Sequence, residues 1–181
     1  ALREPRVAPL EGPGIRVGRT FARHPRMQAA RRGQSNYVNR VSPLTPYYRE
    51  LLILRIGWNC QAVYEWAKHV GSVGRARDHG LDPRWIAQGE DATGWDDTER
   101  ALIRAANEMY RDTMISDETW ATLSQSYDSH QLMSIAWTVA RVGPGLADGR
   151  DVFETGSTWK QMTSEAISFL TGRASPAGPL R

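Results

Sequence analysis

Hydrophobic and polar residues follow a helical period along most of this chain. In residues 95–112, WDDTERALIRAANEMYRD, one stripe of a helix collects apolar residues, namely Ala101, Leu102, Ala105, Ala106 and Met109. No stretch shows the sustained two-residue alternation that is typical of a half-buried strand. The pattern predicts an all-α fold, a compact helical domain of six to eight helices.

Residues suited to cap a first helical turn precede five of the predicted helices, some with a proline in the first turn or a partner three residues later. They are Thr45 with Pro46, Asp82 with Pro83, Asp96 with Glu99, Ser116, and Asp128 with Gln131. Each marks a helix start.

The ends of the helices are marked less clearly. Gly57 predicts an end or a kink in the helix that starts at Pro46. Residues 59–80 are expected to form one long helix that stops near Gly80, and a final helix is expected over about residues 157–170. Trp66, Trp120 and Trp137 are expected on buried helix faces or at a subunit interface.

Proline and glycine in the first twenty residues predict an extended N-terminal arm over 1–20, and the last ten residues predict a C-terminal tail over 172–181. Residues 21–171 are expected to form one domain, because no long linker or fixed-period repeat divides them. The chain begins with Ala1 and not with Met, which leaves open whether a leader preceded it.

Composition narrows the class of protein. The chain has 181 residues and one cysteine, so no internal disulfide is expected and a cytoplasmic location is favoured. No apolar run reaches the length of a membrane span. The net charge is +3, but the arginines are mixed with acidic residues, so no nucleic acid or membrane partner is expected. A basic surface suits a small carboxylate substrate.

Candidate chemistry is concentrated in residues 50–70, ELLILRIGWNCQAVYEWAKHV. Glu65 and His69 are four residues apart, so they share one helix face and can share a hydrogen bond. A chain reversal near Gly57 would bring Glu50 to them from the preceding helix. Buried together, the carboxylates are expected to raise the pKa of at least one of them and to favour charged His69. Such a group can act as acid and base.

Simpler interpretations of these residues remain open. A glutamate and a histidine at this spacing are common on surface helices, although the apolar neighbours here argue for burial. The triplet Glu50, Glu65 and His69 could in principle hold a divalent metal, but no metal and no cofactor is expected. Cys60 is expected to be a buried, inert thiol or else a lone reactive one, and Tyr64 a core residue or a substrate contact.

The other histidines fit structural positions in the predicted helices. His24 precedes a proline, His79 precedes Gly80 at a predicted helix end, and His130 follows the Asp128 cap. None of the three is expected to take part in chemistry.

The order of these motifs resembles a known family. The run Arg49-Glu50-Leu51, then twelve residues from Glu50 to Ala62, then YEWAKH, is similar to the carboxymuconolactone decarboxylase family, which includes the alkylhydroperoxidase D proteins. The segments HGLDPRWIAQG, WDDTERALIRAANEMY and SDETWATLSQSYDSHQLMSIAWTV continue the resemblance in order and spacing, over roughly residues 43–142. The resemblance implies an all-α fold and a homo-oligomer.

The two branches of that family imply different chemistry. In the peroxidase branch a glutamate, a Cys-x-x-Cys pair and a histidine relay protons to a thiol. Glu50 and His69 match this pattern, but Ala62 and Glu65 occupy the cysteine positions. The decarboxylase branch has a glutamate, an aromatic residue, two further residues and a histidine, which Glu65, Trp66 and His69 match.

The resemblance and the residues together predict a lyase-like or isomerase-like enzyme. We expect cofactor-independent acid–base catalysis on a small organic acid or lactone, with His69 as proton carrier, Glu65 orienting it, and Glu50 as a second acid or base. Cys60 and Tyr64 are candidate substrate contacts. The alternatives are a thiol peroxidase that uses Cys60, and a non-catalytic small-molecule-binding or partner protein on the same scaffold.

Overall fold

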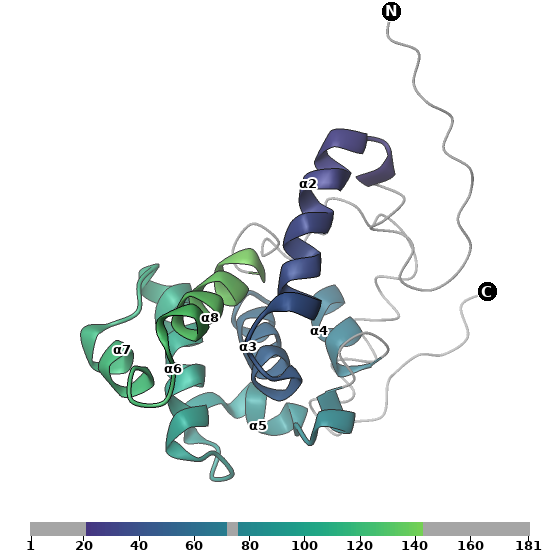
Figure 1. The fold of residues 1–181 in the computed structure, drawn as a ribbon. Coiled ribbons are helices and arrows are strands. Elements are labelled where there is room, and N and C mark those ends of the chain that lie inside the picture. Colours follow the sequence, from purple (N-terminus) through teal and green to yellow (C-terminus); the bar gives the residue numbers. More distant parts are fainter. Residues whose placement is uncertain (1–20, 72–75, 143–181) are drawn as a thin grey trace, which may run out of the picture.

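The computed structural model describes residues 21–71 and 76–142, and in these residues it contains helices and no strand (Figure 1). Seven α-helices are present: α2 (Pro25–Asn36), α3 (Pro46–Asn59), α4 (Val63–Val70), α5 (Pro83–Gln88), α6 (Asp97–Asp112), α7 (Asp117–Leu123) and α8 (Ser129–Val142). A π-helical turn, η1 (Tyr37–Val41), and two 3-10 turns, η2 (Ala76–His79) and η3 (Gly89–Asp91), connect some of them. The all-α prediction is confirmed. The predicted arm, tail and final helix lie outside the described residues.

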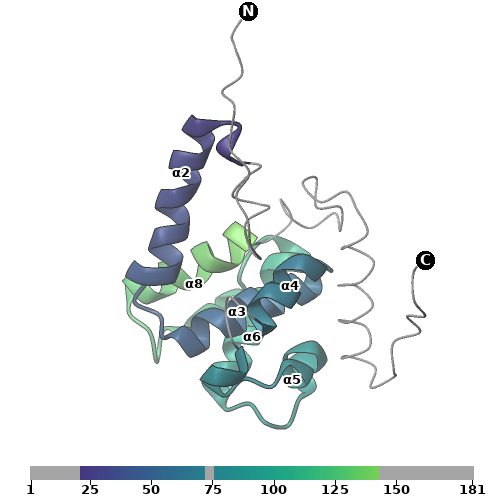
Figure 2. The same ribbon diagram turned by 90° about the vertical axis from the view of Figure 1, so that its right-hand side faces the viewer.

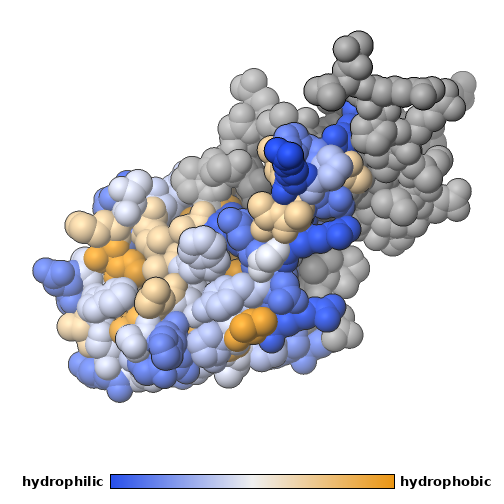
Figure 3. Space-filling view, turned by 45° about the horizontal axis from the view of Figure 1, so that its top comes forward, coloured by the Kyte–Doolittle hydropathy of each residue, from blue (hydrophilic) through white to orange (hydrophobic). Residues whose placement is uncertain are grey.

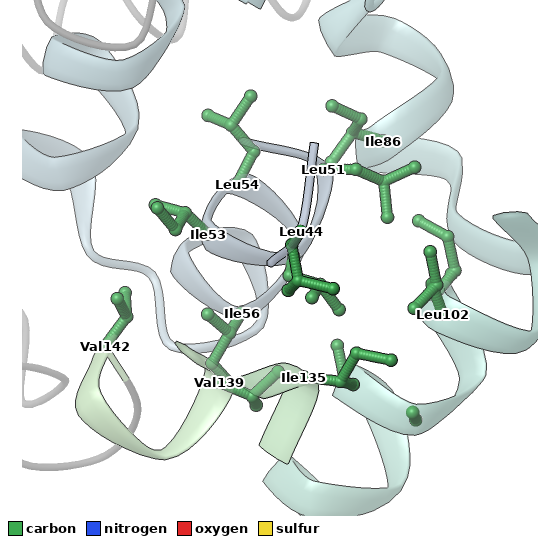
Figure 4. Packing of buried hydrophobic residues seen from close by; sticks show 14 of the residues in the cluster. Leu44, Leu51, Ile53, Leu54, Ile56, Ile86, Leu102, Ile135, Val139 and Val142 are labelled. Carbon is green, nitrogen blue, oxygen red and sulfur yellow. The ribbon is translucent and has the colours of Figure 1, made fainter. Parts of the chain in front are cut away.

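Helix α3 forms the centre of the domain. It contacts α4, α5, α6 and α8, which surround it in Figures 1 and 2. Its side chains Ile53, Leu54 and Ile56 are fully buried or nearly so. Ile56 lies toward Val139 of α8, whereas Leu54 lies on the opposite side of α3 (Figure 4), and each buried side chain of this size contributes about 1.5–3 kcal/mol. A polar side chain on α3 therefore lies in the core unless it reaches the surface.

The predicted helix starts are confirmed. A side-chain oxygen of the capping residue accepts a hydrogen bond from a backbone N–H in the first turn, and two of the caps are reciprocal capping boxes. The caps are Thr45, Asp82, Asp96 with Glu99, Ser116, and Asp128 with Gln131.

The predicted helix over residues 59–80 is wrong. Helix α3 continues through Gly57 to Asn59, and the chain then turns at Gln61, whose φ is 55°. The N–H of Ala62 donates to Gly57 O at 2.8 Å and the N–H of Gln61 to Trp58 O at 3.0 Å, which are the two bonds of a Schellman motif. Helix α4 then has only 8 residues and ends at Val70, followed by Gly71. The chain reverses as predicted, but the reversal occurs at Gln61 and not at Gly57.

Of the three tryptophans expected on buried helix faces or at a subunit interface, one is buried within the domain. Trp66 is buried, whereas 41% of Trp120 and 46% of Trp137 is exposed. On α8 the buried residues include Ile135 and Val139, and Trp137 lies about 200° around the helix from Ile135, so it faces away from the core. The stripe predicted on α6 is confirmed, with Ala101, Leu102, Ala105 and Ala106 buried and Met109 partly buried against the core.

The described surface is mixed in character. In the face drawn in Figure 3, hydrophobic side chains are interspersed with hydrophilic ones. None of the helices in residues 21–71 and 76–142 combines the length and the apolar character needed to cross a membrane.

The left-handed conformation of Gln61 is open to a direct test. A side chain with a Cβ costs about 1–2 kcal/mol in this region relative to glycine, and a β-branched side chain costs most. We expect Gln61→Gly to keep or raise the free energy of unfolding measured in urea, and Gln61→Val to lower it by about 1–2 kcal/mol relative to the glycine variant. Gln34→Val, at an exposed position inside α2, is the matched control. Equal stability of the two Gln61 variants would contradict the turn.

Candidate functional site

Three polar side chains from α3 and α4 meet at the contact between these helices. The Nδ1 atom of His69 lies 2.6 Å from Oε2 of Glu50, and its Nε2 atom lies 3.2 Å from Oε1 of Glu65. We call these residues the Glu–His–Glu triad. The structure thus brings together all three residues that the sequence singled out as acid–base candidates.

Local structure explains why the triad forms. Glu50 lies on the fully buried part of α3, one turn after the Thr45 cap. The Schellman turn at Gln61 reverses the chain, so that α4 packs back on α3 and its last turn places His69 beside Glu50. Glu65 lies in the first turn of α4, one turn before His69 on the same face.

Burial differs along the triad. Glu50 is 1% exposed and His69 is 5% exposed, whereas 21% of the Glu65 side chain is exposed. Glu50 also lies against Arg49, whose Nε is 3.3 Å from Oε1. The triad therefore runs from the core, at Glu50, toward solvent, at Glu65.

The two carboxylates determine the charge of His69. Burial by itself lowers the pKa of this imidazole, but the hydrogen bonds to Glu50 and Glu65 outweigh burial and raise the pKa from 6.5 to about 9. His69 is therefore an imidazolium at neutral pH, as expected from the sequence, and both of its N–H groups donate to carboxylate oxygens.

The expected rise in the pKa of a carboxyl group is not found at Glu65. Burial raises the pKa of Glu65, but the hydrogen bond to His69 and the charges of Arg141 and Arg31 together hold it below its ordinary value of 4.5. The prediction considered repulsion between two carboxylates. The protonated imidazole between them and the nearby guanidinium groups reverse its sign for this residue.

The two arginines were missed by the sequence analysis. Arg141 lies in the last turn of α8 and Arg31 on α2. Nothing in the local pattern of either helix indicates that it approaches α4, since this depends on how α2 and α8 pack. The only signal in the sequence was the placement of Arg141 at the end of a predicted helix.

The other two candidate contacts, Cys60 and Tyr64, are not part of the triad in what the structure describes. Cys60 is the residue after α3 and is 3% exposed, and burial raises the pKa of its thiol. Within the described residues, no hydrogen bond joins Cys60 to the triad. The side chain of Tyr64 lies outside what the structure describes, although its backbone belongs to α4.

The remaining histidines agree with structural roles. His24 is the N-cap of α2, where its Nδ1 accepts a hydrogen bond from the N–H of Met27 at 3.1 Å. His79 is the last residue of η2, and His130 is exposed in the first turn of α8.

A second buried carboxylate provides a contrast. Glu108 accepts hydrogen bonds from the N–H and the hydroxyl of Ser116 and from the hydroxyl of Thr119, all within 2.8–2.9 Å. These donors belong to the N-terminus of α7, so Glu108 fixes that helix to α6 and has an evident structural role. Glu50 has no such helix end to stabilise, and its close partners are His69 and Arg49.

The geometry of the triad leaves no ring nitrogen of His69 free to bind a metal ion. Both nitrogens of His69 face carboxylate oxygens, whereas a metal ligand must offer a ring nitrogen lone pair. Among the described residues there is no group of three or more His, Cys, Asp or Glu side chains placed to hold a metal ion.

Comparison with known proteins gives no match: no protein-family model fits this chain, and neither a curated protein nor a solved structure is significantly similar to it. The resemblance to the carboxymuconolactone decarboxylase family therefore depends on the motifs in the sequence.

Removal of Glu50 tests the charge of His69. We expect the native His69 imidazole to titrate near pH 9 by NMR, and Glu50→Gln to move this pKa toward 6.5, because the deepest anionic acceptor is lost. Glu118→Gln, which changes a largely exposed carboxylate on α7, is expected to leave the titration unchanged. A native His69 that titrates near 6.5 would contradict the triad.

The same shift predicts how stability depends on pH. Because the folded state raises the pKa of His69 from 6.5 to about 9, this group contributes stability that is complete below pH 6.5 and lost as the pH rises through 9. The loss is on the order of a few kcal/mol and is expected to be smaller in Glu50→Gln, as measured by urea unfolding at several pH values.

Proposed function

We propose that this chain is a cofactor-independent acid–base enzyme that acts on a small organic acid or lactone by decarboxylation or isomerisation. The observation that supports this most is the Glu–His–Glu triad, a hydrogen-bonded path for protons that begins at a buried carboxylate and ends at a partly exposed one. Burying these charges costs free energy, and buried ionisable groups with shifted pKa values are concentrated at functional sites.

The protonation states at neutral pH suggest a division of roles. Glu65 is a carboxylate and so can accept a proton, while His69 is an imidazolium and so can donate one through Nε2. An acid and a base side by side near neutral pH suit the transfer of a proton between two positions of a carbonyl compound, which is an isomerisation.

Burial favours a different assignment of the two carboxylates from the one that the sequence suggested. Glu50 is too deeply buried to meet a substrate, and it holds Nδ1 of His69 at 2.6 Å, so we assign it a positioning role. Glu65 is the member that can reach both His69 and a substrate. In this proposal Glu65 and His69 are the catalytic residues and Glu50 orients and charges His69.

Decarboxylation uses the same groups. The bond from the substrate carbon to its carboxylate breaks, carbon dioxide leaves, and the electron pair remains on the substrate, delocalised onto a neighbouring carbonyl group. The Nε2–H of His69 protonates the resulting enolate or carbanion, and His69 recovers a proton from solvent through Glu65. The reaction requires no oxidant and no cofactor.

The thiol peroxidase alternative has less support. A peroxidatic cysteine reacts as an accessible thiolate, whereas Cys60 is buried and its pKa is raised. Ala62 and Glu65 stand where the resemblance would require cysteines.

A non-catalytic role remains the second candidate, and one observation favours it. Both N–H groups of His69 are already bonded to carboxylates, so the triad also describes a stable internal ion cluster that joins α3 to α4. A binding protein on this scaffold would bind small acids without turnover.

Self-association and a cytoplasmic location are part of the same proposal. Met133 and Trp137 are exposed four residues apart on α8, so they share one face, and Trp120 of α7 is also exposed. Large apolar side chains of this kind are enriched in subunit interfaces, which supports a homo-oligomer.

Substitution of the triad tests catalysis. We expect His69→Gln and Glu65→Gln each to lower kcat/KM by about 100-fold or more on a substrate selected from small acids and lactones by carbon dioxide release or by solvent deuterium incorporation. The native activity is expected to fall as the pH rises through about 9, where His69 loses its proton. In Glu50→Gln this alkaline limb should move to lower pH, which a purely structural role would not produce.

The exposed His130→Ala variant is the control and should retain full activity. Folded His69→Gln and Glu65→Gln proteins that turn over the substrate at the native rate would exclude the acid–base proposal. Tight binding of acids with no turnover by the native chain would favour the binding protein.

Substitution of the cysteine separates the peroxidase alternative from this proposal. We expect Cys60→Ser to keep the acid–base activity within about twofold, because the thiol does not contact the triad, and we expect the native chain to show no hydroperoxide reduction that depends on Cys60. Hydroperoxide reduction that disappears in Cys60→Ser would reverse the order of the two candidates.

A further inference from the structure

An arginine at the end of α8 has a buried donor without an acceptor. Arg141 lies in the last turn of α8 and is partly buried. Its Nε atom is buried and has no hydrogen-bond partner in the part of the chain that the structure describes. A desolvated N–H of a charged group without an acceptor is unfavourable, so this position is suited to an acceptor from outside the described residues.

A second arginine, Arg31 of α2, also stabilises the charge of Glu65. The guanidinium carbon of Arg31 lies 4.7 Å from the centre of the Phe21 ring, an arrangement that restricts its side chain. Helix α2, PRMQAARRGQSN, contains three arginines and no acidic residue, so no carboxylate of its own helix neutralises Arg31.

The two arginines lie within electrostatic range of each other and of Glu65, the exposed end of the triad. Both stabilise the charge of Glu65, and Arg31 opposes the positive charge of Arg141. In Figures 1 and 2 the end of α8 lies near α2 and α4. Two guanidinium groups beside one carboxylate leave an excess of positive charge that a second anion would neutralise.

The charges around the triad support the same conclusion. Within residues 21–71 and 76–142, these interactions connect two anions, Glu50 and Glu65, with four cations when His69 is protonated: Arg31, Arg49, Arg141 and His69. The group therefore has a net positive charge. The excess positive charge lies beside Glu65, the member of the triad that solvent reaches.

We propose that Arg141 and Arg31 form a subsite for the carboxylate of a small organic acid, beside Glu65 and His69. The planar N–H groups of arginine match the two oxygens of a carboxylate and bind it through two parallel hydrogen bonds. The buried Nε of Arg141 gains the acceptor that it lacks. The subsite names the groups that recognise the substrate. Its role in catalysis rests on the proposed function.

The subsite also restricts which carboxylate it holds. Arginines that bind a carboxylate stabilise it as an anion, which opposes its loss as neutral carbon dioxide. The bound carboxylate is therefore one that the substrate keeps through the reaction. Held there, it orients the neighbouring carbon toward Glu65 and Nε2 of His69, which is how positioning lowers a barrier.

Direct binding of succinate tests the subsite without any need for turnover. We expect succinate to bind the native chain at millimolar concentrations and to shift the NMR signals of the His69 ring, while succinamide, its neutral analogue, does not. Arg141→Gln and Arg31→Gln are each expected to weaken succinate binding by about tenfold or more. Arg32→Gln, at the exposed neighbouring position on α2, is the matched control and should bind as the native chain does.

Each outcome bears on the subsite separately from the catalytic proposal. No succinate binding by the native chain, equal binding of succinamide, or unchanged binding in both Arg141→Gln and Arg31→Gln would overturn the subsite even if His69 proves catalytic. Binding that depends on Arg141 or Arg31, in a chain whose triad variants lose no activity, would support the subsite and reject the catalytic role. Arg31→Gln changes only the partly exposed α2, so the test remains available if Arg141→Gln fails to fold.

Discussion

The hydrogen bond between Glu50 and His69 is the interaction on which the arrangement of this domain depends. Helix α3 is surrounded by other helices, so a carboxylate at its buried face loses its hydration and requires a partner. His69 supplies that partner only because the chain reverses at Gln61 and returns along α3. Removing one member of a buried pair leaves an uncompensated charge, which costs about 3–5 kcal/mol. The contact therefore holds α4 against α3 and, together with Glu65, charges His69.

The sequence predicted those parts of the fold that local hydrogen bonds determine. Capping residues such as Thr45 and Asp96 bond to backbone atoms within the same turn, so their effect does not depend on the rest of the chain. The turn at Gln61 was not predictable in this way, because a left-handed residue after a helix is most often glycine, and Gly57 offered a more obvious signal. Likewise, Trp137 looked like a core residue until the packing of α8 determined its outward direction.

The same distinction applies to the candidate site. Glu65 and His69 were recognisable from their spacing within one helix, and Glu50 from its apolar surroundings and the family resemblance. Arg31 and Arg141 were not, since α2 and the end of α8 are separated by about a hundred residues and only the tertiary packing brings both near Glu65. The hydrogen bond and charge of His69, and after them the charges of Arg141 and Arg31, lower the pKa of Glu65, which is the opposite of the expected direction. The prediction considered the burial and mutual repulsion of the carboxylates and gave too little weight to the cations beside Glu65, first of all the charged His69.

The exposed end of the triad is the feature on which the proposed proton path depends. A buried Glu50–His69 pair needs only a neutral acceptor, such as a backbone carbonyl, to satisfy the second N–H of the imidazolium. Here a second carboxylate occupies that position, which raises the basicity of His69 further. The hydrogen bond to His69, together with the charges of Arg141 and Arg31, holds the pKa of this carboxyl group below its ordinary value. A group that remains ionised, reaches solvent and contacts a charged imidazole can exchange protons with both. A purely structural pair gains little from that combination, which is why the combination supports the proposal of an acid–base site.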